Sequence, residues 1–214
     1  MGVAAKICGL STSEAVAASV AGGAAYIGFV FYPPSPRAVS PDRAAGLCAE
    51  IPTGILRVGL FVDADDALIE TALAAAPMDI LQFHGSESPQ RVADAKLRFS
   101  RPVMKAMPIA GPQDVLAVVP YEEVADLLLF DAKPPRRPDA LPGGNGLVFD
   151  WNLIAARSWL RPWLLSGGLT ADLLPEAVRV SGAAAVDVSS GVVSSAGQKD
   201  PAKIRAFLSA AHAL

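Results

Sequence analysis

Residues 3–31, VAAKICGLSTSEAVAASVAGGAAYIGFVF, contain the pattern that decides the fold. Two short apolar runs, VAAKIC (3–8) and AYIGFVF (25–31), flank an alanine-rich segment that begins with Ser11, Thr12, Ser13 and Glu14. Hydroxyl side chains at this position favour the start of a helix, and runs that are apolar on both faces suit parallel strands covered by helices. The stretch therefore predicts one strand–helix–strand unit of a parallel α/β fold.

The same pattern recurs along the rest of the chain. Six further apolar runs are RVGLFV (57–62), MDILQF (78–83), PVMKAM (102–107), DLLLFD (126–131), RPWLLS (161–166) and AAAVDV (183–188). Helix starts are predicted at Ser40-Pro41, Asp63, Ser88-Pro89, Thr170 and Asp200-Pro201. Eight strand–helix units predict a closed (β/α)8 barrel, a TIM barrel, as a single domain over residues 1–214. An open doubly wound sheet is the rival, but it usually has fewer strands.

The composition indicates which binding partners and which cellular compartment to expect. The chain is 52% hydrophobic and 18% charged, with a net charge of −3, so neither nucleic acid nor an anionic membrane is expected as a partner. No apolar run is long enough to span a membrane, and no secretory signal is expected. Two cysteines, Cys8 and Cys48, cannot form a disulfide framework. We therefore expect a cytoplasmic protein.

Polar side chains fall at the carboxyl ends of the predicted strands, where barrels of this kind carry their active sites. Cys8 ends the first strand, Arg37 follows the second, Gln82 and His84 end the fourth, and Asp131 ends the sixth. Each residue also has an ordinary explanation. Cys8 could be a small buried apolar residue, Arg37 a surface cation, and Gln82, like Lys105, a polar partner inside the barrel. His84 could be a loop histidine and Asp131 a turn residue. Their shared position predicts a functional site.

Two glycine-bearing segments follow the seventh and eighth strands, namely SGGL (166–169) and DVSSG (187–191). Backbone N–H groups of such loops form the common phosphate site of these barrels, although two tight turns would look similar. The segment 132–147, AKPPRRPDALPGGNGL, is predicted to be a long loop after the sixth strand. No CxxC pair, metal-spaced cluster, dinucleotide fingerprint or P-loop occurs, and the only histidines are His84 and His212. Neither a metal nor a cofactor is expected.

Together, KICGL (6–10), YPPSPR (32–37), LQFHG (81–85), LLLFDAK (127–133), SGGL and DVSSGV with the later GQKD resemble the phosphoribosylanthranilate isomerases. The resemblance extends from Lys6 to about Phe207. It implies a TIM barrel of tryptophan biosynthesis that needs no cofactor. The implied reaction is the Amadori rearrangement of a phosphorylated aminosugar, N-(5-phosphoribosyl)anthranilate, to 1-(2-carboxyphenylamino)-1-deoxyribulose 5-phosphate.

The resemblance also implies roles for individual residues. Cys8 would be the general base and Asp131 the general acid, which must hold a proton when the sugar ring opens. A modest downward shift of the Cys8 pKa would suit the base. Arg37 would meet the anthranilate carboxylate, with His84 and Gln82 also binding substrate. The phosphate would be held by Gly144, Gly146, Gly167, Gly168, Ser189, Ser190 and Gly191.

Two positions depart from the family pattern, and several alternatives stay open. Asn145 stands where Ser or Thr is expected, and Val193 stands where an acidic residue is common. A catalytically silent phosphosugar-binding barrel and an isomerase with two aminoaldose substrates both fit the motifs. The indole-forming barrel, which relies on a lysine acid, and the pentulose-phosphate epimerases, which need a His/Asp set, fit less well. The sequence suits a monomer and a homodimer equally.

Overall fold

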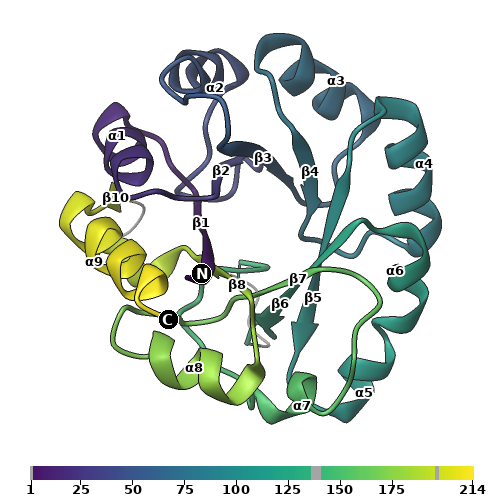
Figure 1. The fold of residues 1–214 in the computed structure, drawn as a ribbon. Helices are drawn as coiled ribbons and strands as arrows, with labels where there is room; N and C mark the ends of the chain where they lie inside the picture. Colours follow the sequence, from purple (N-terminus) through teal and green to yellow (C-terminus); the bar gives the residue numbers. More distant parts are fainter. Residues whose placement is uncertain (1, 136–140, 196–197) are drawn as a thin grey trace.

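Eight parallel strands close into a barrel in chain order in the computed structural model, which describes residues 2–135, 141–195 and 198–214. Figure 1 shows this ring of strands with helices around it. The prediction of a (β/α)8 barrel is therefore confirmed. The strands are β1 Ala4–Cys8, β2 Tyr26–Val30, β3 Leu56–Phe61, β4 Ile80–Phe83, β5 Val103–Ile109, β6 Leu127–Ala132, β7 Trp163–Leu165 and β8 Ala185–Val188.

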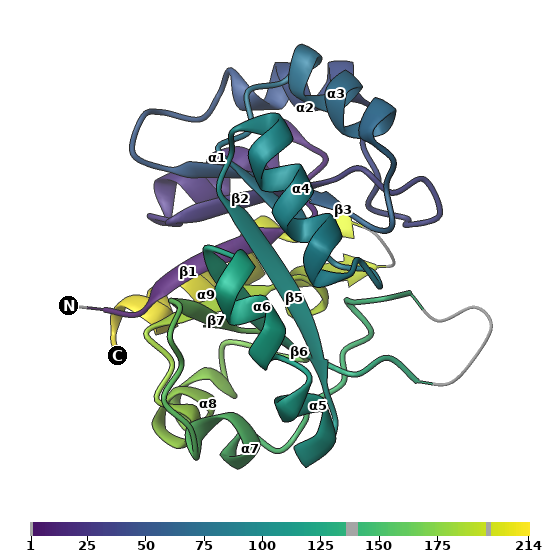
Figure 2. The ribbon, with the colours of Figure 1, turned by 90° about the vertical axis from the view of Figure 1, so that its right-hand side faces the viewer.

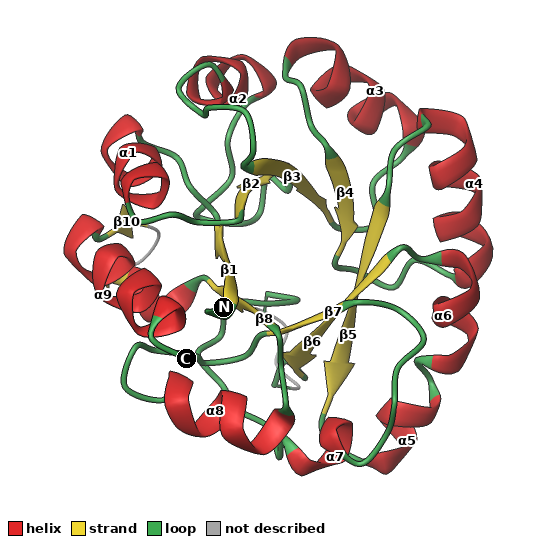
Figure 3. Ribbon diagram, viewed as in Figure 1, coloured by secondary structure: helices red, strands yellow, loops and turns green. Residues whose placement is uncertain are grey.

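Helices follow the strands and form the outer layer (Figure 3). They are α1 Ser13–Ala21, α2 Pro41–Cys48, α3 Asp66–Ala75, α4 Pro89–Phe99, α5 Pro112–Leu116, α6 Val119–Val124, α7 Asn152–Ala155, α8 Leu174–Ser181 and α9 Pro201–His212. A short 3-10 helix, η1 Ser190–Val192, and a hairpin of β9 Val193–Ser195 with β10 Gln198–Lys199 separate β8 from α9. In the part of the β6–β7 connection that the structure describes, residues 133–135 and 141–147 lie outside helices and strands, as predicted for this loop, while Ala132 still belongs to β6.

Four of the predicted helix starts are confirmed by their capping hydrogen bonds, and at the first of them Thr12 Oγ1 accepts from Ala15 N at 3.3 Å before α1. The side chains of Ser40, Ser88 and Asp200 accept hydrogen bonds from backbone N–H groups in the first turns of α2, α4 and α9. A proline occupies the first helical position of each of these three helices, where its missing N–H is not needed. These local signals fix where the chain leaves a strand loop and enters a helix.

Two predicted helix starts are wrong. Helix α3 begins after Asp65, whose side chain caps Leu68 N at 2.9 Å. Asp63 instead has a φ of 47° and accepts hydrogen bonds from the backbone N and Oγ of Ser86, which ties the β3 loop to the β4 loop. Helix α8 begins at Leu174, because Thr170 Oγ1 caps a separate turn that precedes it.

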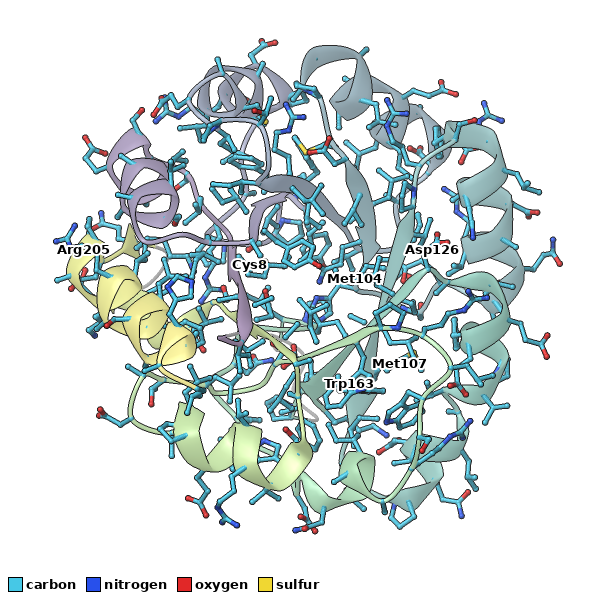
Figure 4. All side chains as sticks on the ribbon, viewed as in Figure 1. Cys8, Met104, Met107, Asp126, Trp163 and Arg205 are labelled. Carbon is cyan, nitrogen blue, oxygen red and sulfur yellow. The ribbon has the colours of Figure 1, made fainter. Side chains whose placement is uncertain are left out.

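The core has an outer and an inner part, which the alternation of strand side chains separates. Outward residues pack against the helices, while a smaller cluster fills the barrel: Val58, Ile80, Met104, Ala106, Leu129 and Leu164. Figure 4 shows Cys8 and Met104 within the ring of strands and Arg205 pointing away from it on α9. Lys105 lies between Met104 and Ala106 on β5 and therefore faces outward, over the Tyr121 ring of α6, not into the barrel.

The chain termini and the loop after β6 lie at opposite ends of the barrel (Figure 2). Because all eight strands run in the same direction, the loops that follow them gather at one end. Of the loop 132–147, residues 136–140 lie outside the described residues, as does Gly197 of the GQKD motif. No helix in the described part of the chain is both long and apolar enough to cross a membrane.

Candidate active site

A pocket opens at the carboxyl ends of the strands and gathers most of the predicted site. Its lining includes Cys8, Arg37, His84, Asp131, Gly144, Gly146, Gly167, Gly168, Ser189 and Ser190. Two predicted residues, Gln82 and Gly191, do not line it. Side chains from the ends of β1 and β6 thus face one space that the glycine loops also border. This is the arrangement that an acid and a base acting on one small molecule require.

The Cys8 thiol lies at the end of β1 and is only 4% exposed. Burial raises the pKa of Cys8 above its ordinary value, and the charge of Asp187 adds to this. The ammonium groups of Lys6 and Lys199 act in the opposite direction. The expected downward shift of the Cys8 pKa is therefore wrong, because desolvation of the sulfur outweighs the two cations.

The Asp131 carboxylate is held at both oxygens. Oδ1 accepts a hydrogen bond from Ala132 N at 2.9 Å, and Oδ2 lies 3.2 Å from His84 Nε2. On the far side of the imidazole, Gln82 Nε2 lies 3.2 Å from His84 Nδ1. The two nitrogens of the imidazole thus link the Gln82 amide to the Asp131 carboxyl group. Gln82 is fully buried and orients His84 instead of bordering the pocket.

The Arg37 guanidinium enters the pocket from the loop after β2. Its side chain is largely buried, at 9% exposure, yet its Nε has no hydrogen-bond partner among the described residues. Nη2 donates only one long hydrogen bond, of 3.5 Å, to Gly144 O. A buried guanidinium with unused donors is costly unless an anion completes its hydrogen bonds. The geometry is thus suited to a carboxylate ligand.

Two glycines shape the loop after β7. Gly167 and Gly168 have φ angles of 90° and 60°, which side chains rarely adopt. A Cβ atom would lie 2.8 Å from Ala132 N at Gly167 and 2.8 Å from Leu147 O at Gly168. The loop after β7 therefore packs directly on the chain that follows β6. At Gly191, a Cβ would collide with Leu169 O, so this glycine joins the β7 and β8 loops from behind the pocket wall.

Lys6, Ser166, Asp187 and Lys199 were not predicted as site residues, although the last three lie in the motifs SGGL, DVSSG and GQKD. Lys6 and Asp187 form a buried ion pair of 2.8 Å, and Ser166 Oγ donates to the other Asp187 oxygen at 3.1 Å. The Lys199 ammonium donates to Ser189 O at 2.8 Å and to Ser189 Oγ at 3.1 Å. Burial and the nearby Arg37 lower the pKa of Lys199 to about 7.

These residues carried a usable signal in the sequence. Lys6 is an ionisable residue inside an apolar run, two positions before Cys8 and so on the same face of the strand. The alternation of a strand therefore places its side chain inside the barrel, where a lysine is rare without a partner.

The two departures from the family pattern are accommodated locally. Asn145 Nδ2 donates to Leu141 O at 2.8 Å and so braces the described end of its own loop. Val193 lies in β9, where its carbonyl accepts from Lys203 Nζ at 2.8 Å, and its side chain does not line the pocket. Among the described residues, no group of three or more His, Cys, Asp or Glu side chains could hold a metal ion.

Comparison with known proteins agrees with this geometry. The family model of N-(5'-phosphoribosyl)anthranilate (PRA) isomerase matches residues 5–210. The N-(5'-phosphoribosyl)anthranilate isomerase of Paracoccus denitrificans is 55% identical over 214 residues, covering 100% of this chain and 99% of the relative.

Solved structures lead to the same family. Monomers generated from the dimeric phosphoribosylanthranilate isomerase of Thermotoga maritima match with a TM-score of 0.84 at 34% identity, covering 99% of this chain and all of the other. A phosphoribosylanthranilate isomerase in complex with reduced 1-(o-carboxyphenylamino)-1-deoxyribulose 5-phosphate matches with a TM-score of 0.85 at 33% identity and the same coverage. The family predicted from the motifs is confirmed, and the chain belongs to the N-(5'-phosphoribosyl)anthranilate isomerases.

Proposed function

We propose that this enzyme isomerises N-(5'-phosphoribosyl)anthranilate to 1-(2-carboxyphenylamino)-1-deoxyribulose 5-phosphate in tryptophan biosynthesis, with Cys8 as general base and Asp131 as general acid. Family membership supports the reaction. The observation that carries the residue roles is the common pocket, because Cys8 and Asp131 border the same space from β1 and β6. We also propose that residues 1–214 form one catalytic domain and that the enzyme acts in the cytoplasm.

The two ends of the substrate match two different walls of the pocket. The anthranilate carboxylate would complete the hydrogen bonds of the buried Arg37 guanidinium, whose Nε is otherwise unpaired in the described part of the chain. The phosphate would lie against Gly167, Gly168, Ser189 and Ser190, with backbone N–H groups as donors. The ribose between these ends would then reach both Cys8 and Asp131.

The proposed reaction begins with ring opening. Asp131 donates its proton to the ring oxygen as the C1–O bond breaks, and the lone pair of the anthranilate nitrogen forms the C1=N bond of a protonated Schiff base. The resulting Asp131 carboxylate accepts from Ala132 N and lies 3.2 Å from His84 Nε2. The hydrogen bonds seen here therefore stabilise the product of the acid step.

The second half moves a proton between neighbouring carbons. The Cys8 thiolate removes the C2 proton, whose electron pair forms the C1=C2 bond while the C1=N electrons return to nitrogen. The Cys8 thiol then gives a proton to C1 while the C2 hydroxyl gives its proton to the Asp131 carboxylate and becomes the ketone, which restores the thiolate and the carboxylic acid. The Schiff base acts as the electron sink, so the reaction balances without a cofactor.

Turnover of the substrate tests the proposal against a silent phosphosugar-binding barrel. Purified protein mixed with N-(5'-phosphoribosyl)anthranilate should abolish the anthranilate fluorescence of the substrate and yield a product of unchanged mass. A parallel assay with a histidine-pathway aminoaldose separates a dual-substrate enzyme from a specific one. Binding of the first substrate without any fluorescence decay would contradict the proposed activity. Sedimentation of the same sample distinguishes the monomer from the homodimer, both of which stay predictions.

A further inference from the structure

A fully buried lysine lies directly beneath the thiol. Lys6 precedes Cys8 by two residues on β1, so both side chains point into the barrel, and the Lys6 side chain is 0% exposed. Its Nζ donates to Asp187 Oδ1 on the neighbouring strand β8 at 2.8 Å. A buried ion pair of this kind is weak evidence for stability, because the cost of desolvating both charges offsets much of their attraction. Its position therefore calls for a functional explanation.

Gly28 opens the space in which the lysine and the thiol meet. This residue of β2 pairs with Cys8 in the sheet, and it faces the barrel interior because its neighbours Ile27 and Phe29 face the helices. A Cβ built on Gly28 would lie 3.1 Å from Cys8 Sγ and 3.2 Å from Lys6 Nζ. The sulfur and the ammonium are thus both within contact distance of one point, and any side chain at position 28 would separate or displace them.

We propose that Lys6 is a positioning residue for the isomerisation: its ammonium, paired with Asp187 and adjacent to Cys8, stabilises the thiolate form of the sulfur that removes the C2 proton. The inference rests on the proposed role of Cys8. It concerns the charge state of the base and involves no contact between Lys6 and substrate.

The other charges around the sulfur fit this role. Lys6 lowers the pKa of Cys8 by its charge and by a hydrogen bond, while Asp187 on β8 raises it and Lys199 on β10 lowers it. Arg37, His84 and Asp131 border the same pocket from the loop after β2, the end of β4 and the end of β6.

Lys6 is the ammonium that lies on the same strand face as the sulfur. Because burial alone would keep the thiol protonated, the base depends on this neighbouring positive charge.

The decisive experiment titrates the Cys8 sulfur itself. The ultraviolet absorbance of the thiolate is recorded against pH for wild type, Lys6→Met and Lys105→Met. For each of these proteins, the absorbance of the matching Cys8→Ser variant is subtracted, which removes the contributions of Cys48 and the tyrosines. Lys6→Met should raise the Cys8 titration midpoint by about one pH unit or more, the usual effect of an adjacent unit charge. The rising limb of kcat/KM should move by the same amount.

Lys105→Met is the matched control, because it removes an equally buried strand lysine with its own carboxylate partner, Glu87, on the outer face of the barrel. Its Cys8 midpoint should stay at the wild-type value. If Lys6→Met does not fold, Asp187→Asn is compared with Lys6→Met/Asp187→Asn, which carries no unpaired buried charge. The double variant should have the higher midpoint.

Equal midpoints in either comparison would overturn the inference. Wild-type turnover by Cys8→Ser would instead overturn the proposed role of Cys8 as base. In that case the shift of the sulfur midpoint in Lys6→Met would still report whether the lysine stabilises the thiolate. The two failures are therefore distinguishable.

Discussion

Lys199 links the charge of the site to the stability of the fold, and Lys199→Met isolates this effect. The ammonium reaches from β10 to Ser189 O and Oγ at the edge of the phosphate loop, and the side chain is largely buried. Desolvation and the Arg37 charge lower its pKa to about 7. A lysine in the unfolded chain titrates near 10.4. The folded and unfolded states therefore bind different numbers of protons across a wide range of pH.

The sign of the effect follows from proton counting. Between about pH 7 and pH 10.4 the unfolded chain binds more protons at Lys199 than the folded chain, so the free energy of unfolding rises with pH. The destabilisation that the buried Lys199 charge causes is complete below pH 7 and absent above the pKa that Lys199 has in the unfolded chain. At about 1.4 kcal/mol per pH unit, this group alone should add roughly 2 to 3 kcal/mol between pH 7 and pH 9.

Urea unfolding followed by tryptophan fluorescence provides the assay. Wild type should gain this free energy of unfolding relative to Lys199→Met as the pH rises from 7 to 9. The hydrogen bonds to Ser189 that the variant loses affect both pH values similarly, so the difference between the two pH values reports the buried charge. Lys203→Met, which removes an exposed lysine of α9, is the matched control and should follow wild type. Parallel curves for wild type and Lys199→Met would refute the reasoning.

Three further predictions concern the pocket. Arg37→Lys should raise KM about 10-fold, since an ammonium cannot replace a bidentate guanidinium. An unchanged KM in steady-state assays would contradict the proposed contact between Arg37 and the substrate carboxylate. Gly168→Ala should lower the free energy of unfolding by about 1 to 3 kcal/mol, because its φ is 60° and the new Cβ meets Leu147 O. Gly46→Ala in α2, whose Cβ meets nothing, should be neutral or stabilising and serves as its control. Because burial raises the pKa of Cys8, kcat/KM should still be rising above pH 7, and a plateau reached below pH 7 would argue against this thiol as the base.

The fold was predictable because each of its units carries its own local signal. Strands such as Tyr26–Val30 are short apolar runs, and helices such as Pro41–Cys48 begin with a capping side chain and a proline. One error occurs where two signals of the same kind lie close together. Asp63 and Asp65 both resemble helix caps, and only the packing of the β4 loop assigns Asp63 to Ser86.

The site was only partly predictable because its electrostatics depend on which strands become neighbours. Motifs locate Cys8 and Asp131 at strand ends and Arg37 in the loop after a strand, and the pocket brings them together. The pairing of Lys6 with Asp187 joins residues 181 positions apart, which no local pattern reveals. The predicted direction of the Cys8 pKa shift was wrong for the same reason, because the shift reflects burial of the thiol among three charged neighbours.

The most direct test of the central claim is the turnover of Cys8→Ser and Asp131→Asn, measured by decay of anthranilate fluorescence, beside their affinity for a non-reacting substrate analogue. If the two groups act as base and acid across one sugar, each variant should lose roughly 100-fold to 10,000-fold in kcat. The affinity for the analogue should change little, because Arg37 and the glycine loops are intact. Turnover at the wild-type rate in either variant would contradict the role assigned to that residue.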